Sequence, residues 1–102
     1  MEESIMESAR SVAPCFAPGN IYVTAGVHAL VENGTFHPAP YLKRHLSGDW
    51  GDIDPEDWEE NQSALEHHNR LLSVYHVTPQ LTLWIITEWD RSMTTMLLPE
   101  EY

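Results

Sequence analysis

The stretch LLSVYHVTPQLTLWIITEWDRSMTTMLL, residues 71–98, contains three apolar runs that are separated by the short segments TPQ and DR. Branched and aromatic residues dominate these runs, as is typical of β-strands, and both connections are short enough for hairpins. The middle run, residues 81–89, is almost continuously apolar, which predicts a central strand covered on both faces. The stretch therefore predicts a three-stranded antiparallel meander in which the last run, SMTTMLL, lies at an edge of the sheet.

The segments before this meander carry one strand signal and several helix signals. IYVT at residues 21–24 reads as a short strand, and AGVHALVEN at residues 25–33 reads as a short helix that Gly34 ends. A second helix is expected from about Pro40 to Leu46, with Gly48 closing it.

A third helix is expected to begin at Asp54-Pro55 and to run to about His68. Asp54 suits the N-cap and Pro55 the first helical position, where the helix dipole also favours the acidic residues that follow. Residues 5–13 are open to two interpretations, a short helix or a frayed tail. The fold class that follows is α+β, with short N-terminal helices followed by a three- or four-stranded antiparallel meander.

The length of 102 residues suits a single α+β domain over residues 1–102, in which residues 1–18 could be a mobile N-terminal segment. Sixteen acidic and five basic side chains give a net charge of −11, which repels nucleic-acid phosphates and attracts cationic protein surfaces. We therefore expect a protein partner with a basic surface and disfavour direct binding to DNA or RNA.

The single cysteine, Cys15, excludes an internal disulfide and a zinc site with four cysteines or with two cysteines and two histidines. The N-terminus, MEESIMESARSVAP, has neither the basic region of a signal peptide nor an apolar run long enough to cross a membrane. These features predict a cytoplasmic protein that does not associate with membranes, and no motif indicates a cofactor.

The most unusual segment is SGDWGDIDPEDWEENQ, residues 47–62, which holds seven carboxylates and no basic residue. Acidic residues at the start of a helix are common, so a solvated helix start explains part of this pattern. Carboxylates at i,i+3 and i,i+4 repel one another, however, and a locally unfavourable choice often marks a functional site. We therefore expect a surface for a cationic partner, with ion pairs and cation–π contacts. Its residues are Asp49, Trp50, Asp52, Asp54, Glu56, Asp57, Trp58, Glu59 and Glu60.

Trp50 has two open interpretations, since a tryptophan flanked by glycines can be either a loop anchor packed in the core or an exposed contact. A calcium loop is excluded because Asp52-Ile-Asp54 lacks the glycine that the EF-hand pattern requires. A zinc site is also disfavoured, because His67 and His68 are adjacent and would point about 100° apart on a helix.

Four blocks of the C-terminal half resemble a known family, namely RHLSGDWGD at 44–52, NRLLSVY at 69–75, LWIIT at 83–87 and DRSMTTMLLPEEY at 90–102. The family comprises small proteins carried on plasmids, prophages and integrated elements of bacteria, and the resemblance covers residues 39–102. Its members are often labelled as a type I restriction system subunit M. The chain lacks both the glycine-rich turn and the Asn/Asp-Pro-Pro-Tyr/Phe motif of an adenine methyltransferase, so the label does not suit it. The resemblance implies an accessory protein of a mobile element and supplies no catalytic residues.

Three functional hypotheses follow from these features. The first is a binding protein with an anti-defence or regulatory role, which engages the nucleic-acid site of a host protein partly as a DNA mimic. The second is an enzyme similar to the barnase–colicin–RelE ribonucleases, with His45 as general acid or base, Arg91 on the phosphate and Thr94 or Thr95 as a donor. The third is a homodimer that pairs through SMTTMLL. The binding protein is the hypothesis that the charge favours.

Overall fold

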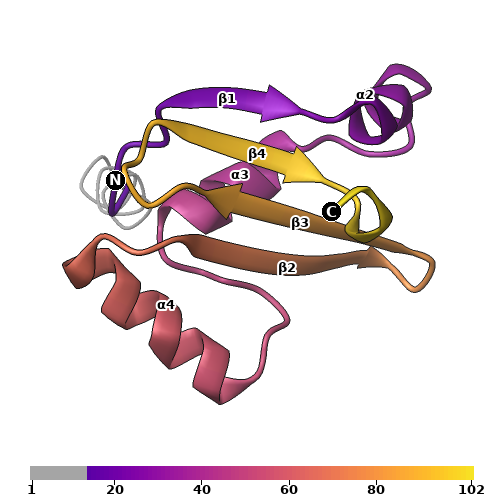
Figure 1. The fold of residues 1–102 in the computed structure, drawn as a ribbon. Coiled ribbons are helices and arrows are strands. Elements are labelled where there is room, and N and C mark those ends of the chain that lie inside the picture. The colour runs from indigo at the N-terminus through magenta and orange to yellow at the C-terminus, as the bar shows by residue number, and fades with distance from the viewer. Residues whose placement is uncertain (1–13) are drawn as a thin grey trace, which may run out of the picture.

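The computed structural model describes residues 14–102, so the helix or tail expected at residues 5–13 lies outside the described part. Four strands form one sheet in the order β1-β4-β3-β2 (Figure 1). They are β1 (Asn20–Val23), β2 (Leu71–Thr78), β3 (Leu81–Thr87) and β4 (Met93–Leu97). The expected meander is present as β2, β3 and β4, which pair antiparallel in sequence order.

The strand β1 changes the sheet from the expected one, because it pairs parallel with β4. The sheet is therefore mixed, and the prediction of a purely antiparallel sheet is wrong. Three helices and the strands β2 and β3 separate β1 from β4 in sequence, so no hairpin fixes their relative direction. The prediction that SMTTMLL forms an edge is also wrong, since β4 lies between β1 and β3 and the edges are β1 and β2. A dimer through the last strand has no free edge to use.

Three helices lie between β1 and β2, so the helices do not all precede the sheet as expected. They are α2 (Ala25–Glu32), α3 (Ala39–Leu46) and α4 (Pro55–His67), and a short 3-10 turn, η1 (Pro99–Glu101), ends the chain. The Asp54 side chain accepts a hydrogen bond from the Asp57 backbone N–H at 3.0 Å, which confirms it as the N-cap of α4. The expected helix positions are confirmed to within one or two residues at each end.

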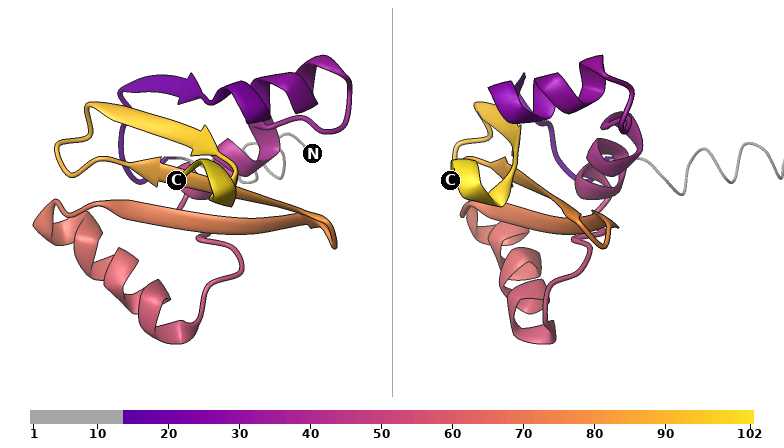
Figure 2. Two further views of the ribbon diagram at one scale, coloured as in Figure 1. Left: turned by 45° about the vertical axis from the view of Figure 1, so that its right-hand side comes forward. Right: turned by 90° about the vertical axis from the view of Figure 1, so that its right-hand side faces the viewer.

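The helices α2 and α3 cover one face of the sheet, and η1 lies on the opposite face (Figure 2). The main core lies beneath α2 and α3, and its buried members are Val27, Phe36, Tyr75, Leu83, Ile85 and Met96. A second cluster of Trp50, Ala64 and Leu71 joins α4 to the first residue of β2. In residues 14–102, no helix is long and apolar enough to cross a membrane.

Candidate protein-binding surface

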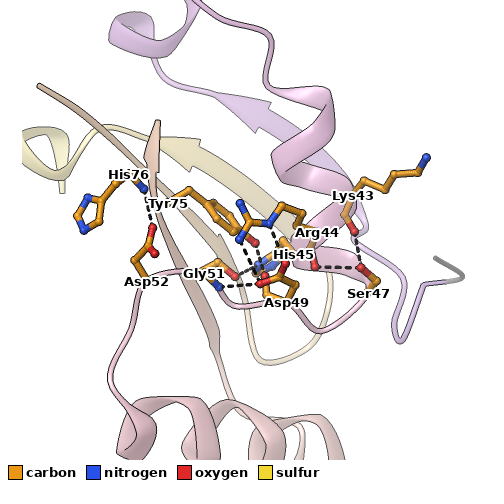
Figure 3. A network of polar contacts seen from close by, with 10 residues as sticks. Lys43, Arg44, His45, Ser47, Asp49, Gly51, Asp52, Tyr75 and His76 are labelled. Carbon is orange, nitrogen blue, oxygen red and sulfur yellow. Dashed lines mark hydrogen bonds and ion pairs between the residues drawn. The ribbon is translucent and has the colours of Figure 1, made fainter. Parts of the chain in front are cut away.

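The first part of the acidic segment closes one edge of the sheet. The loop after α3 runs beside β2, where the Val74 N–H donates to the Trp50 carbonyl at 3.1 Å and the Asp52 N–H donates to the Val74 carbonyl at 2.6 Å. Two residues further along β2, the His76 N–H donates to the Asp52 carboxylate at 2.9 Å (Figure 3). Asp52 therefore completes the hydrogen bonding of an edge strand.

The side chain of Asn61 on α4 continues this edge closure at Leu72. Its amide nitrogen donates to the Leu72 carbonyl at 2.7 Å, and its amide oxygen accepts from the Leu72 N–H at 3.3 Å. The outward-facing N–H groups of residues 72, 74 and 76 and the carbonyls of residues 72 and 74 thus meet partners from the acidic loop or α4. Exposed strand edges invite pairing with other chains, and this one is blocked.

Gly51 permits the close approach of the loop to β2. Its φ is +82°, a left-handed conformation that side chains disfavour. A Cβ atom placed there would lie 2.1 Å from the Val74 carbonyl oxygen. Glycine is therefore required at position 51 for two reasons: its φ is positive, and a side chain would clash with β2.

Asp49 and Arg44 form an ion pair that anchors the start of the loop (Figure 3). The Arg44 Nε donates to Asp49 Oδ2 at 2.8 Å, and this bond lowers the pKa of Asp49 and raises that of Arg44. The Arg44 guanidinium also lies 4.6 Å from the centre of the Tyr75 ring, whose hydroxyl donates to the Asp49 carbonyl at 2.6 Å. Asp49 therefore has a partner within the chain and is not free to attract a cation.

Trp50 is fully buried, which settles its two interpretations in favour of a core anchor. Its indole N–H donates to the Gln62 side chain at 2.8 Å, and its ring packs near Phe16 and His45. The assignment of Trp50 to an exposed contact surface is therefore corrected. Trp58 is half-buried against the same cluster, so only part of its ring is open to a partner.

The second part of the acidic segment lies on α4 and differs from the first part. Its carboxylates are exposed, and within residues 14–102 no hydrogen bond or ion pair holds their side-chain oxygens. These residues are Glu56, Asp57, Glu59 and Glu60. The predicted cationic-partner surface is thus reduced to this helix, because Asp49, Asp52 and Asp54 bond within the fold.

A hollow of about 400 Å³ lies between α4 and the outer face of β2. Asp57 and Glu60 line it from the helix, and its apolar lining is supplied by Ile53, Ala64, Leu72 and Val74. Arg70 and three uncharged polar residues, Asn61, Ser63 and Asn69, complete the lining. The hollow combines an apolar lining with one arginine, Arg70, and with two carboxylates, Asp57 and Glu60, that have no hydrogen-bond partner among residues 14–102. The sequence did not signal this feature.

The residues of the ribonuclease hypothesis do not gather at an open site. His45 is fully buried, and its Nδ1 and Nε2 lie 2.6 Å from the Ser73 hydroxyl and 2.9 Å from the Thr87 hydroxyl. Burial lowers the pKa of His45 to about 3, with a smaller effect from the charge of Arg91, so the imidazole is neutral near pH 7. A buried neutral imidazole has no route for exchanging protons with a substrate.

Arg91 and the two threonines, Thr94 and Thr95, likewise take positions that serve the fold. The Arg91 guanidinium donates to the backbone carbonyls of Asn69 at 2.6 Å and Ala64 at 2.9 Å, and so holds the C-terminal end of α4. Thr94 is buried, whereas Thr95, its neighbour on β4, points to the other face of the sheet. These positions do not form the site that the ribonuclease hypothesis requires.

The hydroxyls around His45 form a chain whose direction can be deduced. Thr94 donates to the Pro18 carbonyl at 2.8 Å, so it must accept from the Thr87 hydroxyl, which lies 2.7 Å away. Thr87 then accepts from the Nε2–H of His45, and Nδ1 accepts from Ser73. The chain links α3 to three strands and to the segment before β1.

Comparison with known proteins gives no further assignment: no family model, no curated protein and no solved structure matches this chain. In the described part of the chain, no three histidine, cysteine, aspartate or glutamate side chains are grouped as a metal site. Of the residues that organise the surface, sequence reasoning missed Arg44 and Asn61. Neither has a local signal, because each acts on a partner that only the tertiary fold brings close.

Proposed function

We propose that this protein is a cytoplasmic binding protein that engages a basic surface of another protein through α4 and the hollow beside it. The observation that carries the proposal is the pairing of free carboxylates, Asp57 and Glu60, with an apolar floor. Arginine and lysine side chains are complementary to this combination, since each has an aliphatic stem that carries a positively charged head group. A stem packed on Leu72 and Val74 would place its head group beside the two carboxylates.

The charge of the whole chain supports the same kind of partner. A net charge of −11 accelerates encounter with a cationic surface and opposes binding to phosphates. Basic surfaces that bind nucleic acids are the most strongly cationic surfaces of many proteins. We therefore infer an anti-defence or regulatory role for an accessory protein of a mobile element, in which α4 occupies such a surface partly as a phosphate mimic.

The test compares two variants with the same change in charge. Asp57→Lys/Glu60→Lys alters the hollow, whereas Glu32→Lys/Glu100→Lys alters exposed carboxylates on α2 and η1. The partner is first captured with the native protein from a host lysate and purified, and its Kd is then measured at several salt concentrations. We expect a loss of at least about a hundredfold for the hollow variant at low salt and less than about tenfold for the control. Equal losses in both variants would mean that only the net charge matters and would refute the hollow as the site.

The ribonuclease alternative is tested by incubating the purified protein with labelled RNA and DNA. We expect both substrates to remain intact. Cleavage that disappears in both His45→Ala and Arg91→Ala, with the variants still folded, would replace the binding proposal.

A further inference from the structure

The two edges of the sheet differ in how they are protected. The outward-facing groups of β2 are closed by the loop at Gly51 and by Asn61, as described above. At the opposite edge, no other labelled element lies along the outer side of β1 (Figure 1). Among residues 14–102, the fold therefore leaves one edge of the sheet available for strand pairing.

The hydrogen bonds of β1 show which of its backbone groups face β4 and which face away from it. The Asn20 N–H donates to the Ser92 carbonyl at 3.0 Å, and the Thr24 N–H donates to the Met96 carbonyl at 3.1 Å. Backbone groups alternate in direction along a strand, so the groups of even-numbered residues face β4. The N–H and C=O groups of Ile21 and Val23 consequently point away from the sheet.

The side chains at this edge are apolar and unusually exposed. Ile21, Tyr22 and Val23 have exposed fractions of 46%, 50% and 40%, and Met93 on the neighbouring strand has 38%. Natural edge strands are usually protected by lysine, proline or a bulge, and β1 has none of these. No acidic or basic residue occurs in residues 14–27 or 92–99, and the carboxylate of Glu101 reaches the chain only beyond the end of β1, where it accepts from Thr24 and Gly26. A second copy that pairs with residues 20–23 therefore meets no charged side chain of β1 or β4.

We propose that β1 pairs antiparallel with β1 of a second copy about a two-fold axis at Tyr22. This register matches Ile21 of one copy with Val23 of the other, and all four outward groups of each copy find partners. The four hydrogen bonds that result are the most that this short strand can form with itself. A shift of the register by two residues would leave at least one of the two residues unpaired.

The pairing joins the two sheets into one of eight strands, whose outer edges are the two protected β2 strands. It also places an α4 helix at each end of the assembly, so one dimer presents two copies of the proposed binding surface. Two sites on one body bind a multivalent partner more tightly than one. The contact is small, because β1 has four residues, and the dimer is therefore expected to dissociate at low protein concentration.

Disulfide trapping tests the register. Residues directly opposite each other at a non-hydrogen-bonded position have Cα atoms about 4.5 Å apart, within the range that a disulfide spans. In a Cys15→Ser background, Tyr22→Cys should form a covalent dimer under mild oxidation, whereas Ile21→Cys should not, because Ile21 faces Val23 of the other copy. Thermal melts of both variants establish that they are folded. Folded Tyr22→Cys that stays monomeric, or equal trapping at both positions, would overturn the proposed register.

Sedimentation of the full chain over a range of concentrations tests the dimer without a cross-link. Tyr22→Lys places two ammonium groups face to face at the axis and should weaken dimerisation at least about tenfold. Gln80→Lys, at the exposed turn between β2 and β3, makes the same charge change away from the axis and should not weaken it. Salt separates this proposal from the proposed function, because screening should strengthen association of two acidic copies and weaken binding to a basic partner. A native chain that remains monomeric at all concentrations and at high salt would refute the dimer and leave the binding surface on α4 untouched.

Discussion

Replacement of the buried His45 by leucine tests the hydrogen-bonded chain that links α3 to the sheet. Leucine has a similar bulk but no polar atoms, so the Ser73 and Thr87 hydroxyls would each lose a partner at a site without solvent. Each unsatisfied buried hydroxyl costs about 1–3 kcal/mol. We therefore expect His45→Leu to lower the free energy of unfolding by about 2–6 kcal/mol, against a total of about 5–15 kcal/mol for a domain of this kind.

The origin of this loss of stability can be checked by also removing the two hydroxyls that contact the imidazole. Ser73→Ala and Thr87→Val remove the two hydroxyls that each lose the imidazole as a partner in His45→Leu, and Thr94 still donates to the Pro18 carbonyl. The triple variant should then be more stable than His45→Leu alone, because replacing both partners of a hydrogen bond costs less than replacing one. Denaturant unfolding at one pH measures all the variants. A triple variant that is less stable than His45→Leu would refute the deduced chain.

The same histidine predicts a specific dependence of stability on pH. Its pKa is about 3 in the folded protein and about 6.5 in an unfolded chain, so between these values the unfolded state binds more protons. Stability from this group is complete above pH 6.5 and is lost as the pH falls toward 3. His45→Gln does not titrate and keeps one donor and one acceptor. Between pH 7 and pH 4 the native protein should lose about 3 kcal/mol more than His45→Gln, at 1.36 kcal/mol for each unit of pKa difference.

His28→Gln serves as the control for this titration, because His28 is an exposed histidine on α2. Its pH profile should follow that of the native protein. If His45→Gln and the native protein lost stability in parallel on acidification, the imidazole would not be held neutral by burial, and the account of His45 would fail.

Three further substitutions test the closure of the β2 edge and its anchor. Trp50→Ala should lower the free energy of unfolding by about 3–5 kcal/mol, because the ring is fully buried, and chemical denaturation would measure it. Gly51→Ala should cost at least about 2 kcal/mol from its positive φ and its clash with the Val74 carbonyl, seen as a lowered Tm. Asn61→Ala should leave the backbone of Leu72 without partners and speed exchange of the Leu72 amide hydrogen, whereas unchanged exchange would show that Asn61 does not protect it.

Local signals were sufficient to place most of the elements from the sequence. The Asp54-Pro55 start of α4 and the apolar run of β3 are recognisable within a few residues of chain. The place of β1 in the sheet has no such signal, because its four residues pair with residues 93–96, far along the chain. A parallel pair has no hairpin turn that sequence reasoning could detect, and so the mixed sheet and its true edges were missed.

The candidate surface was predicted only in part, for a related reason. Charge counting treats Asp49, Asp52 and Glu60 alike, whereas the fold gives the first two partners at Arg44 and the His76 N–H. Trp50 likewise resembles an exposed contact when only its glycine neighbours are considered. The tertiary contacts that separate these roles involve residues as far apart as Asp52 and His76, and no local pattern contains them.

The remaining carboxylates on α4 lead to a prediction about the balance between stability and binding. Glu60 lies one helical turn from both Glu56 and Asp57, and like charges at these spacings destabilise a helix by about 0.2–0.5 kcal/mol per pair. Glu60→Gln removes both repulsions while keeping the size of the side chain.

Glu60→Gln should therefore raise the free energy of unfolding by about 0.4–1 kcal/mol and the Tm by about 2–6 °C, because Glu60 lies beyond the first turn, where the helix dipole is weak. The same change should weaken binding to a basic partner, since it removes one of the two carboxylates that line the hollow. Gln62→Glu, which adds a carboxylate on the same helix at the side chain that accepts from Trp50, provides a comparison that should not strengthen binding. A Glu60→Gln protein that is less stable than the native one would show that this carboxylate serves the fold, and the case for α4 as a surface kept acidic for a partner would lose its support.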